Sequence, residues 1–511
     1  MTDPDLAAMS DTIDHLTVPL STALTLLARM GDLSMGQPLD HSEQAAACAA
    51  WLAREAGADV AVCVQTALLR WVGCTANADD IAALMEDDVK GRRAMLMLRP
   101  DKMGLRLPLD EAQQAGKLAS DVHCEVASLV ANMLGLPPET AAALGSVFER
   151  WDGGGYSRLG GGAAIPLATR VAVLASDMEI LSREYGSEGG IAMLRTHGAG
   201  VHDPALLALL ERGWRATRPL QEPGEPRELL PRPPGMRDPG VPGAGPPEAD
   251  GLPDAQRPVP LALVADLCDL KLPWLAGHSR AMAHSAALAA QALGITPAPV
   301  ARAALLQGLG RVAIPQRVWN SGGALTAAQW EQVRLYPYRT ARGLGALSGL
   351  AEEAELASHV GERLDGSGYY RGAGGAATLA ARILPAASCW HALRATRPWR
   401  AAFDATAAAA QLQADVQAGR LDGQVVAAML GQAAPATPSP ARAGNPLSPR
   451  ETDVLAVIAR GKSNKEAARV LGLSPSTVRT HMENLFRKLE CNSRAAATLK
   501  AAQLGLIAPT D

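Results

Sequence analysis

The clearest pattern of apolar and polar positions lies at the C-terminal end of the chain, from Leu447 onward. Residues 448–451 (SPRE) form a capping-box sequence, in which the serine caps a helix, the proline suits its first position and the glutamate reaches back to the cap. An apolar stripe at helical spacing follows, made of Val454, Leu455, Ile458 and Ala459. The pattern predicts an amphipathic helix that ends at Gly461.

The same signals predict three more helices. Ser463 or Asn464 caps the second helix, and Ser474 caps the third after a glycine-containing turn. The third helix has an apolar stripe of Val478, Met482, Leu485 and Leu489. A fourth helix, from about residue 493 to 503, is expected to bring Ala497 and Leu504 to the core. Two helices joined by such a turn form the geometry that seats the second one in a major groove of DNA.

The outer face of the third helix is polar and suited to DNA. Arginine can read guanine edges and asparagine adenine edges, whereas threonine, lysine and the first backbone amides suit phosphates. The whole chain has a net charge of -4, yet the segment from Leu447 has ten Lys and Arg against six acids. This local concentration of positive charge favours contact with nucleic acid. A solvated helical surface without a partner is the alternative.

This segment closely resembles the LuxR-type helix-turn-helix domain of bacterial transcription factors, through LSPRE, GKSNKEAARVLGLS, STVRTHMENLFRKL and SRAAA. The resemblance implies a last helix that often supplies a dimer surface. It also implies that several residues lie at or near DNA. Together with Asn484 from the polar face, the expected DNA-binding residues are Lys465, Thr477, Val478, Arg479, Thr480, His481, Asn484 and Lys488.

The composition of the rest of the chain favours helical cores. Hydrophobic residues make up 48% of the sequence but aromatic residues only 4%, so alanine, leucine and valine dominate. We find no apolar run of 18 residues and no signal-peptide pattern, which predicts a cytoplasmic protein without a membrane span. The seven cysteines are scattered and never in CxxC spacing, which indicates structural thiols rather than a zinc ribbon or a disulfide framework.

Two stretches rich in proline, with glycine or alanine, divide the chain into three predicted folded parts. Residues 218–260 and 431–446 cannot form a packed core and are expected to be linkers. The predicted folded parts are residues 16–217, 261–430 and 447–508.

The first two parts are repeats of each other. DHS at 40–42 recurs as GHS at 277–279, and ALLR at 67–70 recurs as ALLQ at 304–307. ERWDGGGYSR at 149–158 recurs as ERLDGSGYYR at 362–371, and ATRVAVLAS recurs as AARILPAAS. In the DGxGY motif the aspartate can bind a cation or organise a turn, and turn formation is the preferred interpretation. Four matches in one order predict two similar all-α bundles.

Both copies resemble the HD-GYP branch of the HD phosphohydrolase superfamily, the second over its whole length. The resemblance implies a helical fold and, in active members, hydrolysis of cyclic di-GMP at a centre of two or three irons. Such a centre needs paired His and Asp ligands around a bridging hydroxide. Whether the chain is an enzyme therefore depends on which of those ligands it keeps.

Most ligands of that centre are replaced in the second copy. His278 and His359 remain, but the His-Asp pair is replaced by Gln307 and Gly308. The remaining family positions are filled by residues that do not hold such a centre: Arg311, Tyr336, Val360 and Ser388.

The first copy keeps only His41 and His123. The other ligand positions are filled by Arg70, Trp71, Val147, Phe148 and Ser176. Two histidines without a carboxylate cannot hold a binuclear centre, and an arginine or a tryptophan would block it by charge or volume. We therefore expect all four histidines to be buried, hydrogen-bonded helix residues. Asp177 and Glu179 offer an alternative mononuclear site, which we do not favour.

These patterns predict an all-α protein of two degenerate HD-GYP-like bundles and a C-terminal four-helix LuxR-type domain. We expect a sequence-specific transcription regulator whose repeats act as a sensor, a dimerisation module or both, with no catalytic site, metal or other cofactor. The expected partners are promoter DNA and a second copy of the chain, with RNA polymerase and a small-molecule or nucleotide effector as further candidates. The alternatives are a metal-dependent, cyclic di-GMP phosphodiesterase-like hydrolase that also binds DNA, and a scaffold that does not bind DNA.

Overall fold

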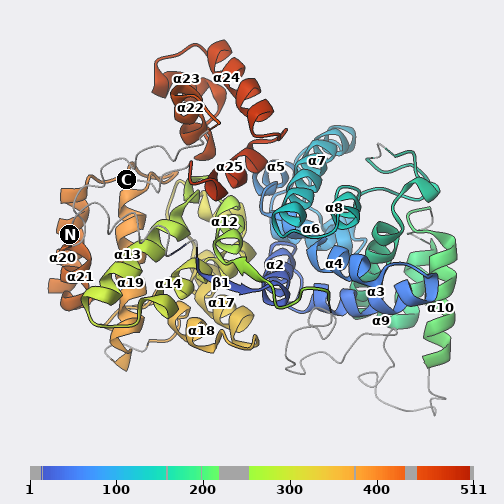
Figure 1. Cartoon of the computed structure of the whole chain (residues 1–511), viewed down its shortest axis with the longest axis horizontal. Helices are drawn as coiled ribbons and strands as arrows, with labels where there is room; N and C mark the ends of the chain where they lie inside the picture. The colour runs from blue at the N-terminus through green and yellow to red at the C-terminus, as the bar shows by residue number, and fades with distance from the viewer. Residues whose placement is uncertain are drawn as a thin grey trace. The chain divides into compact units, whose positions relative to one another are not determined.

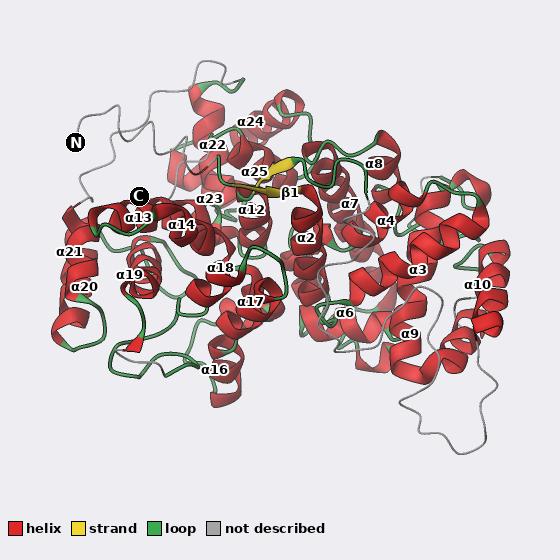
Figure 2. Ribbon diagram, turned by 60° about the horizontal axis from the view of Figure 1, so that its bottom comes forward, coloured by secondary structure: helices red, strands yellow, loops and turns green. Residues whose placement is uncertain are grey.

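A computed structural model of the chain shows an all-helical protein, as the sequence predicts (Figures 1 and 2). The structure describes residues 13, 15–156, 159–196, 198, 200–217, 252–372, 376–431 and 446–506. Most of both predicted linkers, residues 218–251 and 432–445, lies outside the described residues. The described strands are β1 (Thr17–Pro19) and β2 (Pro258–Pro260), which pair in one two-stranded sheet. In the described part of the chain, no helix is both long enough and apolar enough to span a bilayer.

The chain forms two compact units, and the first comprises residues 19–259. Its core is built mainly from leucine, valine and alanine side chains, as the shortage of aromatic residues predicts. Its helices are α2 (Leu20–Ser34), α3 (His41–Ala56), α4 (Val60–Leu69), η1 (Val72–Cys74), α5 (Ala78–Leu84), α6 (Asp88–Leu96), η2 (Pro100–Lys102), α7 (Leu109–Met133), α8 (Pro138–Leu144), η3 (Gly162–Ala164), α9 (Leu167–Thr196) and α10 (Pro204–Thr217).

The second unit comprises residues 1–18 and 260–511. It contains the second repeat and the C-terminal helices. The second repeat consists of α12 (Ala262–Leu270), η5 (Pro273–Leu275), α13 (His278–Ala292), α14 (Pro297–Leu306), η6 (Leu309–Ala313), α15 (Gln316–Trp319), α16 (Ala327–Arg334), α17 (Tyr336–Gly345), α18 (Ala351–Ala357), α19 (Leu379–Arg394), α20 (Ala405–Gln417) and α21 (Gly423–Gly431). The C-terminal helices are α22 (Pro449–Ala459), α23 (Asn464–Leu471), α24 (Pro475–Lys488) and α25 (Arg494–Gln503).

A buried carboxylate has the same place in both repeats. In the first repeat, Asp32 accepts hydrogen bonds from the backbone N and the Oγ of Ser42, at 3.0 and 2.6 Å. In the second repeat, Asp269 accepts the same two bonds from Ser279, both at 2.8 Å. The carboxylate lies ten residues before the serine in each case. These bonds fix the start of α3 and of α13, and they support the repeat independently of the motifs.

An ion pair next to this carboxylate is present in both repeats with its charges exchanged. Arg29 donates from Nε to Glu43 at 2.7 Å in the first repeat. In the second repeat Arg280 donates from Nε to Asp266 at 2.8 Å. Both pairs join residues fourteen positions apart. The two helices are therefore held in the same way although the signs of the side chains are reversed.

Candidate functional site: the outer face of α24 and the HD-like ligand positions

Local capping positions the four C-terminal helices. The predicted capping box at the start of α22 is confirmed: Ser448 N donates to Glu451 Oε2 at 2.7 Å, and Glu451 N donates to Ser448 Oγ at 3.3 Å. Glu451 is buried and also accepts a 2.7 Å bond from Lys488 Nζ on α24. Burial alone would raise the pKa of Glu451, but the bonds from Lys488 and Ser448 outweigh it and lower that pKa. One carboxylate thus ties the first helix to the third.

The second helix, α23, begins with a capping box made by Ser463 and Glu466. Of the two predicted caps, Ser463 is therefore the cap, while Asn464 Oδ1 accepts a 2.7 Å bond from Arg494 of α25. The turn after α23 places Gly472 at φ 65°, a left-handed conformation that glycine adopts without strain. These features fix the angle at which α24 leaves the turn.

The start of α24 is capped and its outer face is open. Ser474 Oγ accepts a 3.0 Å bond from Thr477 N, as the sequence predicts. The core beneath α24 consists of side chains from three helices, with Val454, Ile458, Ala467, Ala468, Val478 and Met482 buried. Among the predicted DNA-binding residues, the exposed ones are Lys465, Thr477, Arg479, Thr480 and Lys488, and the half-exposed ones are His481 and Asn484.

The side chain of Val478 differs from the others in the predicted set, because it is 0% exposed and packs in this core. Its neighbours on both sides face outward, whereas helical periodicity turns Val478 inward, as the apolar stripe of the sequence predicts. The prediction that Leu504 closes the core is wrong. It follows the last residue of α25 and is 47% exposed, and Leu499, at 0%, fills the core instead.

Acidic side chains pair with two of the basic residues on the outer face of α24. Arg479 Nε lies 3.0 Å from Glu483 Oε1 one turn along the helix, and both side chains are exposed. Lys488, at the C-terminal end of α24, forms an ion pair with Glu451 of α22. The first turn of α24 contains no acidic residue, so its backbone amides and hydroxyls form the end best suited to a phosphate.

In the first repeat, the residues at the predicted ligand positions lie together. His41 Nε2 is 3.1 Å from Ser176 Oγ, and Trp71 Nε1 donates to the same nitrogen at 3.2 Å. The ring of His123 packs edge-on against Trp71 and Phe148, with centroids 6.4 and 5.0 Å away. His123 Nε2 also bonds to the backbone O of Arg70 at 2.8 Å, and burial lowers the pKa of this histidine to about 3. Aromatic rings therefore fill the space that a binuclear centre requires.

The remaining charges at this site are paired. Arg70 Nη1 donates to Asp177 Oδ1 at 2.7 Å, and its guanidinium lies 4.2 Å from the Trp71 ring centroid. Glu179 accepts a short hydrogen bond from His41 Nδ1 and a 3.0 Å bond from Arg183. Burial alone would raise the pKa of Glu179, but His41 and Arg183 outweigh it and lower that pKa to about 2. Asp177 and Glu179 are thus committed to side chains of the protein, so the residues do not fit the alternative mononuclear metal.

In the second repeat, Arg311 lies beside the residues at the predicted His-Asp pair. Arg311 Nη2 donates to Gln307 Oε1 at 2.7 Å, and Arg311 Cζ lies 5.4 Å from the Tyr336 ring centroid. A Cβ built on Gly308 would stand 3.7 Å from Arg311 Nη1. A side chain extending from that position would meet the guanidinium. These residues do not fit a divalent metal centre, because a fixed cation repels a metal ion.

The four histidines expected to be buried are 0–4% exposed. The prediction that all four are hydrogen-bonded is wrong for His278, because its Nδ1 has no hydrogen-bond partner. His359 Nδ1 contacts the backbone O of Glu355 at 2.9 Å. Among the described residues, no hydrogen bond or ring contact joins His278 to His359, so this copy does not assemble its two remaining histidines.

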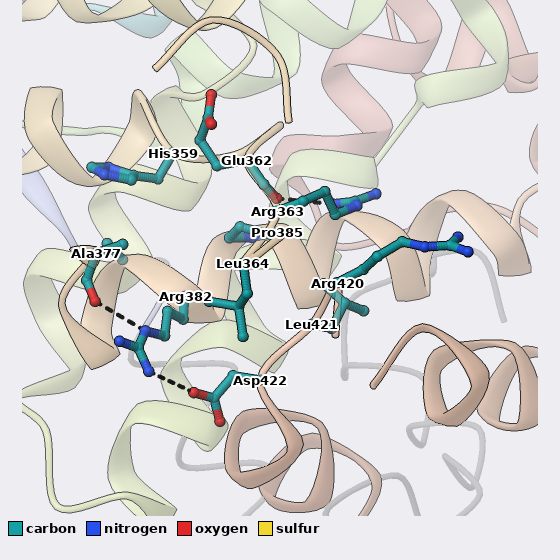
Figure 3. Close-up of a pocket in the computed structure, with 11 residues that line it drawn as sticks. His359, Glu362, Arg363, Leu364, Ala377, Arg382, Pro385, Arg420, Leu421 and Asp422 are labelled. Carbon is teal, nitrogen blue, oxygen red and sulfur yellow. Dashed lines mark hydrogen bonds and ion pairs between the residues drawn. The ribbon is translucent and has the colours of Figure 1, made fainter. Parts of the chain in front are cut away.

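A small pocket of about 20 Å³ lies beside His359 in the second repeat (Figure 3). Arg382 spans one wall, donating to Asp422 at 2.9 Å and to the backbone O of Ala377 at 2.9 Å. Arg420 is likewise paired with an acid, Asp415, at 2.9 Å. These ion pairs leave the lining close to charge balance. The lining residues are His359, Glu362, Arg363, Leu364, Ala377, Ala381, Arg382, Pro385, Arg420, Leu421 and Asp422.

The aspartates of the two DGxGY motifs organise turns, as preferred from the sequence. Asp152 Oδ1 accepts a 2.8 Å bond from Gly154 N, and Asp365 Oδ1 accepts a 2.9 Å bond from Ser367 N. In the part of the chain that the structure describes, no three His, Cys, Asp or Glu side chains are grouped as metal ligands. All seven cysteines are free thiols.

Comparison with protein families finds two domains in the chain. A model described as "HD domain" matches residues 262–425, and one described as "Bacterial regulatory proteins, luxR family" matches residues 445–501. The second match covers α22, α23 and α24 with most of α25.

Individual relatives agree with both matches. The chain is 27% identical over 429 residues to the 3'3'-cGAMP-specific phosphodiesterase 3 of Vibrio cholerae, covering 76% of this chain and 89% of that protein. Over 53 residues it is 53% identical to the nitrate/nitrite response regulator protein NarP of Escherichia coli, covering 10% of this chain and 25% of that protein.

A solved structure shows the same fold. The crystal structure of a cyclic GMP-AMP specific phosphodiesterase from V. cholerae matches with a TM-score of 0.53 and 21% identity, over 81% of this chain and 97% of that one. The fold, the site and the two family matches agree. The chain carries an HD domain over residues 262–425 and a C-terminal helix-turn-helix domain of the luxR family over residues 445–501.

Proposed function

We propose that the protein is a sequence-specific transcription regulator that binds promoter DNA through α24. The observation that carries the proposal is the geometry of this helix: a capped, acid-free first turn, an open polar face and a core that fixes its direction. A helix N-terminus of this kind seats phosphates and places the following side chains at base edges. The luxR family match supports the same function.

The proposed contacts divide by their chemistry. Lys465, Thr477 and Thr480 suit phosphates, because they are exposed and carry a charge or a hydroxyl. Arg479 and Asn484 suit base edges. His481 and Lys488 complete the proposed set, although Lys488 must leave Glu451 to reach a phosphate.

We also propose that the two repeats regulate DNA binding and do not hydrolyse a phosphodiester. The side chains at the former metal centres support this: Trp71 and Phe148 fill one site with rings, and Arg311 fills the other with a cation. The relatives that are phosphodiesterases make hydrolysis the competing function. An effector bound by the repeats shifts DNA affinity only if it has different affinity for two states of the protein.

The function is tested with the purified full-length chain. DNA fragments recovered by genome-wide mapping of bound sites should bind it far more tightly than unrelated DNA of equal length. The same preparation, supplied with iron or manganese, should not hydrolyse 3'3'-cGAMP or cyclic di-GMP. Metal-dependent turnover would establish the competing function, and absence of any DNA preference would contradict the regulator.

A further inference from the structure

A thiol, a thioether and an imidazole meet in the core of the first repeat. Met35 directly follows α2, Cys74 ends η1 and His123 lies on α7. The Sγ of Cys74 lies 3.2 Å from Met35 Sδ and 3.5 Å from His123 Nδ1. All three residues are buried, with exposed fractions of 2%, 3% and 0%. One thiol therefore contacts two further donor atoms that are used by soft and borderline metals, away from solvent.

The hydrogen bonding of His123 directs a lone pair toward this thiol. His123 Nε2 lies 2.8 Å from the backbone O of Arg70, and a carbonyl oxygen can only accept, so Nε2 carries the proton. In the neutral ring Nδ1 is then unprotonated, and this is the nitrogen that faces Cys74 Sγ. A histidine that ligates a metal commonly donates its other ring N–H to a backbone carbonyl in the same way.

The backbone brings the same positions together in both repeats, but the donor atoms occur only in the first. A Cβ built on Gly73 would lie 2.3 Å from the backbone O of His123, so glycine lets η1 approach α7. A Cβ built on Gly310 would likewise lie 2.1 Å from the backbone O of Tyr336. The residue after this glycine is Cys74 in the first repeat and an arginine in the second. The second repeat therefore has the geometry without a thiol or an imidazole.

We propose that Cys74, Met35 and His123 bind one Cu(I) ion. Thiolate and thioether ligands select Cu(I), and imidazole also suits copper. The ion replaces the thiol proton of Cys74, which leaves to solvent, so binding adds no net charge to the core. A divalent ion would leave one uncompensated positive charge there, beside Arg92, which donates to the backbone O of Cys74 at 2.9 Å. Such a buried charge is costly, so the site favours a monovalent ion.

This site differs from an HD-type centre in its ligands and in its metal. Cys74 and Met35 do not lie at the HD-type ligand positions, and only His123 does. The rings of Trp71 and Phe148 pack against His123 and leave no oxygen donor on that side for a hard divalent ion. Metal–sulfur bonds of about 2.3 Å place ligands somewhat farther apart than these atoms are, and the unbranched Met35 side chain can make the adjustment. As an effector site, it rests on the regulatory role proposed for the repeats.

The test uses the full-length chain without DNA, reduced and free of oxygen. Cu(I) is supplied as its coloured complex with bicinchoninate, and transfer to the protein is followed by the loss of that colour. We expect one equivalent of Cu(I) to be retained per chain, with sulfur and nitrogen neighbours in X-ray absorption at the copper edge. Cys74→Ser should lose this equivalent. Met35→Leu, which keeps an apolar side chain of similar size, should weaken retention at least tenfold.

Two matched variants complete the test. Cys48→Ser removes another buried thiol of the first repeat, and Met30→Leu removes a buried thioether of α2. Both should retain Cu(I) as the wild type does. The proposal is overturned if no equivalent is retained, if Cys74→Ser or Met35→Leu retains copper as these controls do, or if Zn(II) binds equally well at the same residues. Because DNA is absent, either result leaves the DNA-binding function to be decided by its own experiment.

Discussion

Replacing Arg479 with alanine separates DNA recognition from folding. The Arg479 side chain is 76% exposed and contacts only Glu483, itself 63% exposed, among the described residues. An exposed pair one helical turn apart contributes about 0.3–0.5 kcal/mol. The substitution should therefore change the stability of the domain by less than the error of most unfolding measurements.

The effect on DNA binding should be much larger. An arginine that donates two hydrogen bonds to guanine contributes about 1–3 kcal/mol, which corresponds to an increase in Kd of about 5- to 150-fold. Arg479 must break its pair with Glu483 to reach guanine, which reduces the gain in binding free energy by less than about 0.5 kcal/mol. For the same reason Glu483→Ala should tighten binding, because it frees the arginine and removes a negative charge that faces phosphate.

Fluorescence anisotropy on a mapped operator, at fixed salt, measures the effect. Operators with single base changes show whether Arg479→Ala loses preference at one position. Arg450→Ala is the control, because Arg450 is equally a surface arginine paired with an acid, Asp453, but lies on α22. A loss that is equal on all DNA sequences would show that Arg479 touches only phosphate. No loss at all would remove Arg479 from the interface.

Four further predictions follow from buried groups. Val478→Ala removes two fully buried methyl groups, so it should destabilise residues 446–506 by about 1–3 kcal/mol in hydrogen exchange. Glu451→Gln weakens the capping box and should cost about 1 kcal/mol by the same measurement. Gln307→His combined with Gly308→Asp should yield no metal-dependent hydrolysis, since other ligands remain absent. Burial raises the pKa of Asp269 to about 7, above that of the same carboxyl in the unfolded chain. The free energy of unfolding should therefore be highest below about pH 4 and fall as pH rises toward 7. Asp269→Asn should flatten this part of the curve of melting temperature against pH.

Features set by local sequence could be predicted. The caps at Ser448, Ser463 and Ser474 depend on residues no more than three positions away, so the sequence alone determines them. The order of motifs also assigned His41, Trp71 and Ser176 to ligand positions of one site, and the structure places these three side chains in contact.

Features set by tertiary packing could not be predicted. The stacking of Arg397 on Trp274 joins segments more than a hundred residues apart that share no motif. His278 Nδ1 lacks a hydrogen-bond partner because of how the surrounding helices pack, which no local motif specifies. Asp32 and Asp269 could have been found, since each lies ten residues before the serine of the repeated HS pair. That spacing is visible in the sequence, upstream of the repeated motifs.

The central claim is that α24 binds DNA in a sequence-specific way, and the salt dependence of binding by the full-length chain tests it most directly. The logarithm of the affinity for a mapped operator should fall linearly with the logarithm of salt concentration, by about 0.9 for each phosphate contacted. The operator should remain at least a thousandfold better than unrelated DNA at physiological salt, roughly the lower limit for specific binders. Binding that is weak, independent of salt and equal on all sequences would contradict the account.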